Sequence, residues 1–409
     1  MDRLLFLAVV ASLPVMQPPL LFIDGYPLVL TDILFVILAA VVAGLILLGR
    51  MRIAWSPFHA AIVAFSLAEF LSAAHLGTRH ALIKAAGSSY LCALGILASH
   101  YSQQRGGARR ILWAWLAGTA VTVIAMGAGL ALFVGGQRSN PFLYGYGSLI
   151  PGAYPRLQGL FVNANVLFTY LAAGVFFLFG AVRARVLPPR VGYGAGAVLV
   201  VGTVFSLSPG LGGLALALAW WWSPSLAPRG ATAARLAGMG AAIAFVLATL
   251  LSPTMLQRSG TLTSLPLEPS SRLMAWRDAA ATFLANPWLG AGPGSDVAHV
   301  SYQNASHFQE FLTDAHNTFL SVLGQTGLVG FACFLWILVP LVARMRMPPD
   351  LTPHRAWRSA CECALMAAVL YPSLSGSFED TRHVWIVLGL LHAAQSGASD
   401  LETAPAVPA

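Results

Sequence analysis

A histidine at the start of an apolar segment is the first candidate for chemistry in this chain. It is His316, in the stretch Thr313-Asp-Ala-His-Asn. We expect Thr313 or Asp314 to cap a helix whose first turn contains His316. The positive end of the helix dipole then disfavours a protonated imidazole, although the carboxylate of Asp314 favours one. A neutral histidine could act as a general base; the alternative is a histidine whose ring is satisfied by the backbone.

Two groups of glycines flank this histidine. Gly324, Gly327 and Gly330 recur every three residues, which gives a smooth stripe against which another backbone can pack. Before the histidine, the stretch Gly290-Ala-Gly-Pro-Gly-Ser295 could bind an anion with its amide groups or form a tight turn. No lysine follows this stretch as it would in a Walker loop, so a tight turn is the favoured interpretation.

The composition places these residues in a membrane protein. Of 409 residues, 57% are hydrophobic and 9% are charged, and the mean hydropathy is +0.72. Soluble domains carry about 25% charged residues, so an ordinary soluble core is excluded. The four cysteines lie in or beside apolar runs, where they are expected to be buried thiols rather than disulfides or metal ligands.

Twelve apolar runs predict an all-α polytopic fold of about 12 transmembrane helices. The runs are approximately 4–22, 28–48, 54–76, 82–99, 111–134, 160–182, 191–207, 211–224, 236–252, 317–343, 359–374 and 383–396. The first could be a signal peptide, but no small-x-small cleavage site follows it. We therefore expect a retained span, kinked by Pro14, Pro18 and Pro19.

The distribution of basic residues predicts the orientation. If the N-terminus is cytoplasmic, 15 of the 23 lysines and arginines face the cytoplasm. This bias fits the positive-inside rule with both termini inside, including a cytoplasmic tail at 397–409. Because the net charge of +8 is then a topology signal, we expect no nucleic-acid partner.

The expected architecture is a single integral membrane domain, 1–409, with two long outer loops. These are a first loop at 135–159 and a large, helical periplasmic loop at 253–316 between spans nine and ten. Within the second loop we expect one helix from Ser270 or Ser271 to Leu284, and another from Asp296 to Leu312.

The histidine segment resembles the O-antigen ligase and polymerase superfamily, which are polytopic bacterial glycosyltransferases with a GT-C-like fold. Ligases of that family carry His, then Asn, Ser or Arg, nine residues, Gly, two residues, and Gly, Thr or Tyr. Here His316, Asn317, Gly327 and Gly330 match that spacing. The stretches 156–165 and 271–292 are similar to other family segments. After the seventh span, however, the family often has Ser-Arg, whereas this chain has Ser-Pro-Gly at 208–210.

The resemblance implies transfer of a glycan from undecaprenyl diphosphate to an acceptor at the periplasmic face of the bacterial inner membrane. The ligase motif implies a lipid A-core acceptor, and a single displacement would invert the configuration at the anomeric carbon. His316 would be the base, and Arg156, Arg272 and Arg258 would bind the diphosphate. No Asp-x-Asp occurs, so neither a metal ion nor another cofactor is expected. For Arg272 and its neighbour Arg277, anchoring to lipid headgroups is the alternative role.

Five further residues are possible supports for this site. Asn317 belongs to the motif, while Asn163 and Asn165 could bind sugar or diphosphate oxygens, or one of them could cap a helix. Arg382 could bind the diphosphate or pair with Glu379 and Asp380 beside it. Glu69 lies within an apolar run, so we expect it to face protein or water; in the latter case it could line a groove for the lipid diphosphate.

Two other functions remain open on the sequence alone. Polymerases of O-antigen or exopolysaccharide share the superfamily, and their acceptor is another lipid-linked glycan. A polysaccharide or lipid transporter is the second alternative, which predicts internal repeats and midplane charges. The chain shows no repeat, so a transporter is the weaker rival.

Overall fold

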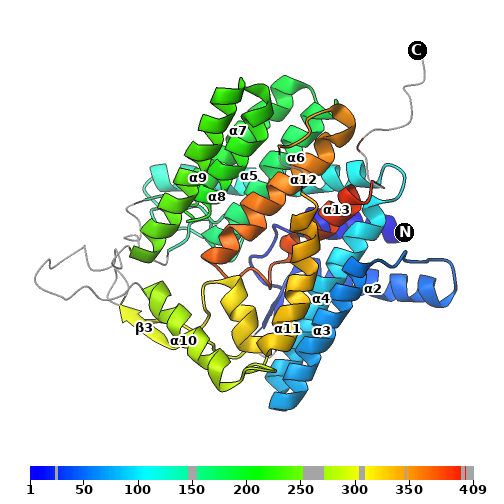
Figure 1. The fold of residues 1–409 in the computed structure, drawn as a ribbon, viewed down its shortest axis with the longest axis vertical. Helices are drawn as coiled ribbons and strands as arrows, with labels where there is room; N and C mark the ends of the chain where they lie inside the picture. Colours follow the sequence, from blue (N-terminus) through cyan, green and yellow to red (C-terminus); the bar gives the residue numbers. More distant parts are fainter. Residues whose placement is uncertain are drawn as a thin grey trace, which may run out of the picture.

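The computed structural model describes residues 1–23, 26–145, 154–251, 271–303, 309–345, 348–397 and 401. Across these residues it is an all-α membrane fold with 13 α-helices and two short hairpins (Figure 1). The helices are α1 (Asp2–Ser12), α2 (Leu30–Leu47), α3 (Pro57–Leu76), α4 (Arg79–Ser102), α5 (Gly107–Val134), α6 (Ala164–Arg183), α7 (Pro189–Phe205), α8 (Leu211–Trp222), α9 (Pro228–Leu251), α10 (Ser271–Ala285), α11 (Thr318–Ala343), α12 (Pro353–Leu365) and α13 (Arg382–Gln395).

Seven of the described helices are long and apolar enough to cross a membrane: α2, α3, α4, α5, α6, α9 and α11. Five more coincide with predicted spans but are shorter, from 11 residues in α1 to 17 in α7. α12 continues into a π-helical turn, Met366–Leu370, and a 3₁₀ turn, Pro372–Leu374. The structure therefore confirms a polytopic helical fold, with several spans shorter than the apolar runs suggested.

The predicted first span at 4–22 is wrong in its extent. α1 ends at Ser12, and the chain then forms a hairpin of β1 (Leu21–Ile23) and β2 (Tyr26–Leu28). Prolines at 14, 18 and 19 account for the difference, because a proline in a helix interior removes a backbone hydrogen bond and clashes with the preceding turn.

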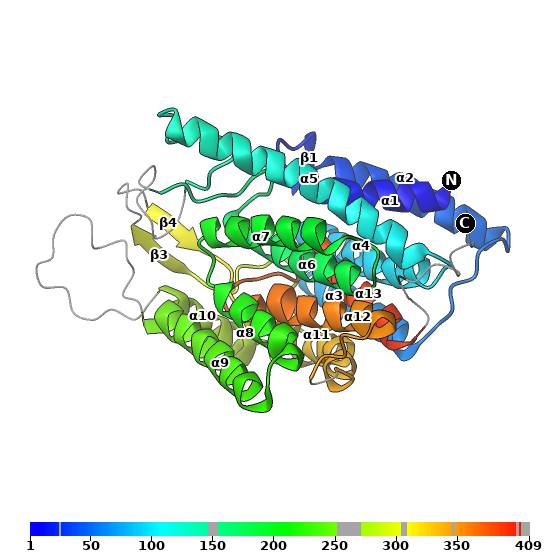
Figure 2. The same ribbon diagram turned by 90° about the horizontal axis from the view of Figure 1, so that it is seen from above.

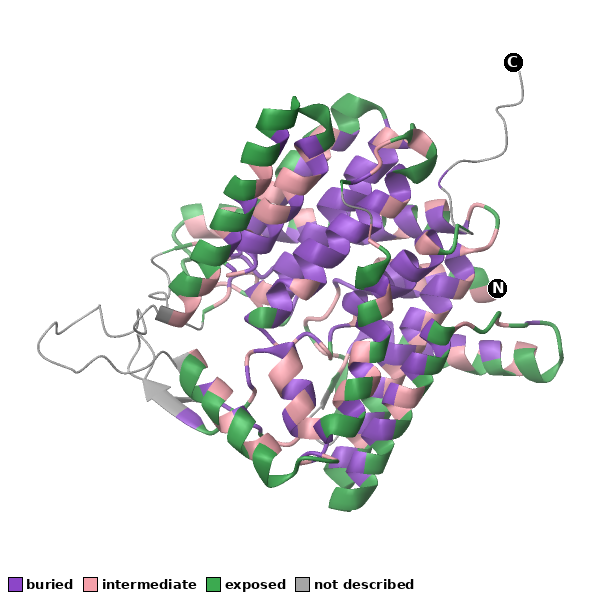
Figure 3. Ribbon diagram, in the orientation of Figure 1, coloured by how far each residue is buried: buried purple, intermediate pink, exposed green. Residues whose placement is uncertain are grey.

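The core of the bundle lies around α6. Every residue of this helix from Ala164 to Val182 is buried except Asn165. The helix packs against α7 and α12, and Trp115 of α5 stacks on Tyr170 of α6. α9, by contrast, exposes Leu236, Ile243 and Leu247, as expected of a helix that faces lipid. Figure 3 shows this contrast between a buried centre and exposed outer helices.

The large loop between α9 and α11 contains the expected helix and one unexpected element. α10 spans Ser271–Ala285, which confirms the first prediction. The helix predicted at 296–312 is wrong, because Val300–Gln303 (β3) and Gln309–Leu312 (β4) pair as an antiparallel hairpin, with Val300 opposite Leu312. Valine, tyrosine and phenylalanine in these segments favour strands. Figure 2 shows this hairpin at one end of the bundle and the N-terminus at the other.

Candidate active site

α11 begins at Thr318, three to four residues later than a cap at Asp314 or Thr313 would place it. Its N-cap is Asn317, whose side-chain oxygen accepts hydrogen bonds from the backbone N–H groups of Phe319 (3.0 Å) and Leu320 (3.1 Å). The predicted cap at Thr313 or Asp314 is therefore wrong. His316 lies just before the helix rather than in its first turn, and its φ of +46° is in the left-handed region.

The imidazole of His316 contacts the carboxylate of Asp314. Ring atom Nδ1 and the backbone N–H of His316 both approach the same oxygen, Oδ1, and the N–H does so at 3.1 Å. Burial alone would raise the pKa of the Asp314 carboxyl, but the hydrogen bond and the charge of His316 hold that pKa below its ordinary value. About a third of the His316 side chain (31%) is exposed, so the ring is accessible to a reactant.

α11 is interrupted at Gly327, and the loop after α10 fills the interruption. Gly327 has φ +63° and ψ −163°, which only glycine adopts readily. The backbone N–H groups of Leu328 and Val329, released from the helical pattern, donate to the carbonyl oxygens of Pro287 (2.8 Å) and Trp288 (3.2 Å). The predicted packing of another backbone against the glycine stripe is thus confirmed at Gly327.

The glycine-rich stretch 290–295 is a turn, not an anion nest. The N–H groups of Ala291 and Gly292 donate to the carbonyl oxygens of Gly324 and Gln325, both at 2.9 Å. The N–H of Gly294 donates to Oε1 of Gln325 at 2.8 Å. Since these amides already bond to α11, the stretch joins the outer loop to the motif helix.

Arg272 and the motif helix meet at one segment, residues 374–381, which links the 3₁₀ turn after α12 to α13. Nη1 of Arg272 donates to the backbone carbonyl of Ser375. From the start of α11, Asn317 donates to the carbonyl of Leu374 (3.4 Å) and Thr318 to that of Gly376 (3.0 Å). The carbonyl groups of three consecutive residues, 374–376, therefore accept hydrogen bonds from Arg272 of α10 and from the first residues of the motif helix, Asn317 and Thr318.

Arg156 lies against a different part of the fold. Its Nε donates to the backbone carbonyl of Ser206 at 3.1 Å, and its guanidinium lies 4.9 Å from the ring centre of Tyr144. Burial lowers the pKa of this guanidinium, and Tyr144 opposes the shift. Ser206 directly follows α7. The resembled family often carries Ser-Arg after this helix, where this chain has Ser-Pro-Gly at 208–210. Arg156 thus contacts the end of α7, whereas Arg272 contacts the segment before α13.

The two asparagines before α6 have different environments. Asn163 is the N-cap, and its Oδ1 accepts a hydrogen bond from the N–H of Val166 at 2.8 Å. This confirms that one of the pair caps the helix. Oδ1 of Asn165 is buried and has no hydrogen-bond partner among the residues that the structure describes.

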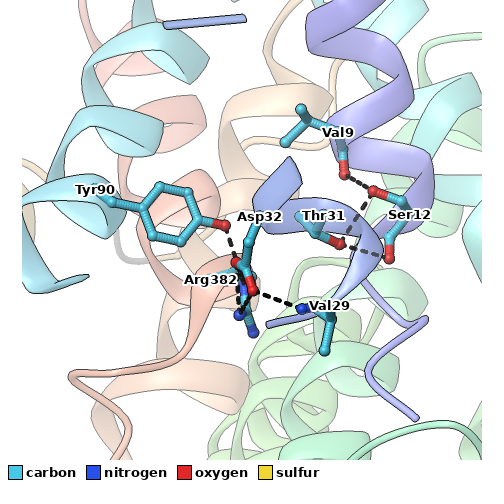
Figure 4. Close-up of polar contacts among 7 residues, drawn as sticks. All are labelled: Val9, Ser12, Val29, Thr31, Asp32, Tyr90 and Arg382. Carbon is cyan, nitrogen blue, oxygen red and sulfur yellow. Dashed lines mark hydrogen bonds and ion pairs between the residues drawn. The ribbon is translucent and has the colours of Figure 1, made fainter. Parts of the chain in front are cut away.

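Arg382 forms an ion pair, but not with the neighbours that the sequence suggested. It binds both carboxylate oxygens of Asp32 at 2.7 Å and also contacts the hydroxyl of Tyr90 (Figure 4). Asp380 pairs instead with Lys84, and Glu379 accepts a hydrogen bond from Ser321 at 2.5 Å. Arg382 therefore ties α13 to the start of α2.

Glu69 lies inside the protein, as its position in an apolar run predicted. It is 6% exposed, and its Oε2 has no hydrogen-bond partner among the described residues. Arg258 lies outside the described residues. Within the described ranges no group of three or more His, Cys, Asp and Glu has the arrangement of a metal site.

Sequence reasoning missed three features of this site. They are the Trp288–Gly327 contact, the 374–381 segment that Arg272 contacts, and Asp32 as the partner of Arg382. The only sequence signal among them was Gly327, because a glycine required by a motif indicates a close approach or a positive φ.

Comparison with known proteins agrees with this arrangement. Residues 163–335, which include α6, α10 and the histidine motif, match the family model described as O-antigen ligase. The match covers less than half of the chain and supports the O-antigen ligase and polymerase superfamily, whose members are membrane enzymes that process lipid-linked glycans. No curated protein matches the chain.

Proposed function

We propose that the protein is a ligase-type glycosyltransferase. It moves a glycan from undecaprenyl diphosphate to a lipid A-core acceptor at the periplasmic face of the inner membrane. The observation that carries the proposal is the convergence of Arg272 with Asn317 and Thr318, the two residues that follow His316, on the carbonyls of residues 374–376. The family match over residues 163–335 supports the same class of substrate.

The chemistry requires a base on one side of the anomeric carbon and cations on the other. His316 accepts the proton of the acceptor hydroxyl as its oxygen attacks the anomeric carbon. The bond to the diphosphate oxygen breaks, and undecaprenyl diphosphate leaves with the charge. A single displacement inverts the configuration.

Arginine side chains stabilise the leaving diphosphate. Arg272 is the first of these, since it and the start of α11 donate to neighbouring carbonyl groups, and Arg156 and Arg258 complete the set in this proposal. A guanidinium binds phosphate oxygens in pairs and stays charged, so arginines do here what a divalent cation does in other transferases. Asn165, whose buried Oδ1 has no hydrogen-bond partner among the described residues, is a further contact for a hydroxyl group. In this proposal Glu69 lines the groove for the lipid diphosphate.

The membrane arrangement follows from the same proposal. The whole chain is one integral domain with both termini, and the tail at 397–409, in the cytoplasm. The loops at 135–159 and 253–316 are periplasmic and carry Arg156, Arg258, Arg272 and His316. Both the positive-inside bias and the placement of β3 and β4 at the end opposite the N-terminus support this orientation.

Deletion of the gene tests the function directly. We expect undecaprenyl-linked chains of many repeats to accumulate, while the lipid A-core carries no glycan; wild type restores transfer and His316→Ala does not. Accumulation of single repeat units would identify a polymerase instead. Normal glycan chains on the cytoplasmic side only would identify a transporter. Full rescue by His316→Ala would overturn the role of the histidine in any of these classes.

A further inference from the structure

Asp314 contacts both the backbone and the ring of His316. One carboxylate oxygen, Oδ1 of Asp314, approaches both the backbone N–H and the ring Nδ1 of His316. The first contact acts on the main chain and the second on the ring, so the same atom orients the backbone and the imidazole together.

The backbone at His316 needs such support. A non-glycine residue at φ +46° is unfavourable, and such residues persist only where their surroundings hold them. Here Ala315 is fully buried against Ala279 of α10 and Val297. Asn317 caps α11 on the other side.

The residue before Asp314 is anchored as well. The backbone carbonyl of Thr313 accepts hydrogen bonds from the N–H groups of Val297 (2.9 Å) and Ala298 (3.1 Å). Asp314 therefore lies between two fixed points, Thr313 and Ala315, and its carboxylate has a defined direction toward the ring.

We propose that Asp314 is a positioning residue for the base, an inference that rests on the proposed function. Its carboxylate accepts the Nδ1–H of His316, which leaves the lone pair of the neutral ring on Nε2. The acceptor hydroxyl gives its proton to Nε2 as its oxygen bonds to the anomeric carbon, and the diphosphate departs with the bonding electrons. The imidazolium keeps both protons, and the carboxylate stays ionised beside it.

Substitution of Asp314 by asparagine separates this role from a purely structural one. An asparagine oxygen can still accept the backbone N–H, but its amide can donate to Nδ1, which moves the ring proton to Nε2. We expect Asp314→Asn to lower kcat about 100-fold, with little change in KM for the donor. Asp296→Asn is the matched control, because Asp296 is an exposed acid in the same loop.

The assay uses substrates from the deletion strain itself. Its extracted lipid-linked glycan is the donor, and its glycan-free lipid A-core is the acceptor. The enzyme is the full chain in detergent micelles. His316→Asn is measured in parallel, so that failure of the proposed function is visible separately.

A spectroscopic readout reports the proton directly. In the full chain labelled with ¹⁵N-histidine, His316→Asn identifies the signals of this one ring among ten histidines. We expect the wild type to show Nδ1–H and Asp314→Asn to show Nε2–H, while Asp296→Asn resembles the wild type.

The outcomes test the positioning role of Asp314 and the role of His316 as the base separately. A loss of kcat with a changed tautomer supports the positioning role. Wild-type kcat in Asp314→Asn, or a loss of kcat with an unchanged tautomer, overturns it. If His316→Asn itself transfers glycan at the wild-type rate, the proposed base is wrong.

Discussion

The backbone of Trp288 occupies the space that a side chain at position 327 would need. A Cβ atom on Gly327 would lie 2.4 Å from both the carbonyl carbon and oxygen of Trp288. These are backbone atoms that cannot move aside easily, because the Trp288 carbonyl accepts a hydrogen bond from the N–H of Val329 and the preceding carbonyl, of Pro287, accepts one from Leu328. The glycine of the motif thus permits the outer loop to insert into α11.

Gly327→Ala should therefore disrupt the loop–helix junction. Both the backbone conformation and the clash are unfavourable, and the strain alone is worth about 1–3 kcal/mol. We expect a lower unfolding temperature in detergent and loss of glycan transfer. Gly127→Ala in α5 is the control, because nothing lies within 4 Å of its Cβ position. Equal stability of the two variants would contradict the assigned role of Gly327.

Arg272 is expected to act through the shape of its guanidinium as well as its charge. Arg272→Ala should lower transfer by about 10²–10³-fold, and Arg272→Lys should restore little, since an ammonium cannot bind two oxygens as a fork. Transfer is measured as the acceptor-linked glycan in the complemented deletion strain. The matched variant is Arg277→Ala, an exposed arginine on the same helix. If both alanine variants lose transfer equally, general attraction to lipid headgroups explains Arg272 better.

The Arg382–Asp32 pair is expected to stabilise the fold rather than bind the donor. The two side chains are only 14% and 10% exposed, and removal of one partner from a buried pair costs about 3–5 kcal/mol. Arg382→Ala and Asp32→Ala should each lower the unfolding temperature without any substrate present. The double variant should recover part of that loss, because neither charge is then left unpaired. An unchanged unfolding temperature together with lost transfer would instead place Arg382 in the donor site.

Glu379 should make stability depend on pH. Burial, reinforced by the charge of Asp380, raises the pKa of its carboxyl from 4.5 to about 8, while Ser321 and Lys84 oppose the shift. Glu69 is a further acid close enough to interact electrostatically with the Glu379 carboxyl. Between these two pH values the unfolded chain loses a proton that the folded protein keeps, so the contribution of Glu379 to stability falls as pH rises from about 4.5 to 8.

Glu379→Gln removes this dependence. We expect the variant and the wild type to unfold at similar temperatures near pH 4.5, and the variant to be the more stable at pH 8.5. Unfolding is followed by fluorescence in detergent at both pH values, with Asp296→Asn as an exposed control. A wild type that gains stability relative to Glu379→Gln as the pH rises would contradict the raised pKa.

The sequence by itself determined the class of this protein. Long apolar runs require helices in a bilayer, because every backbone polar group must be satisfied within its own segment. The helices follow those runs closely from α2 to α6, for instance Pro57–Leu76 against a predicted 54–76. The spacing of His316, Asn317, Gly327 and Gly330 was enough to indicate the family, since a motif records local requirements of one helix and its cap.

Only the tertiary structure decided how those residues are held. The helix is capped at Asn317 rather than Thr313, and Ala315 packs against Ala279 of α10, which residue type does not reveal. Asp32 lies 350 positions from Arg382, and Ser375 lies 103 from Arg272. Such contacts arise when helices distant in sequence pack together, so local patterns of polarity and propensity carry no signal for them.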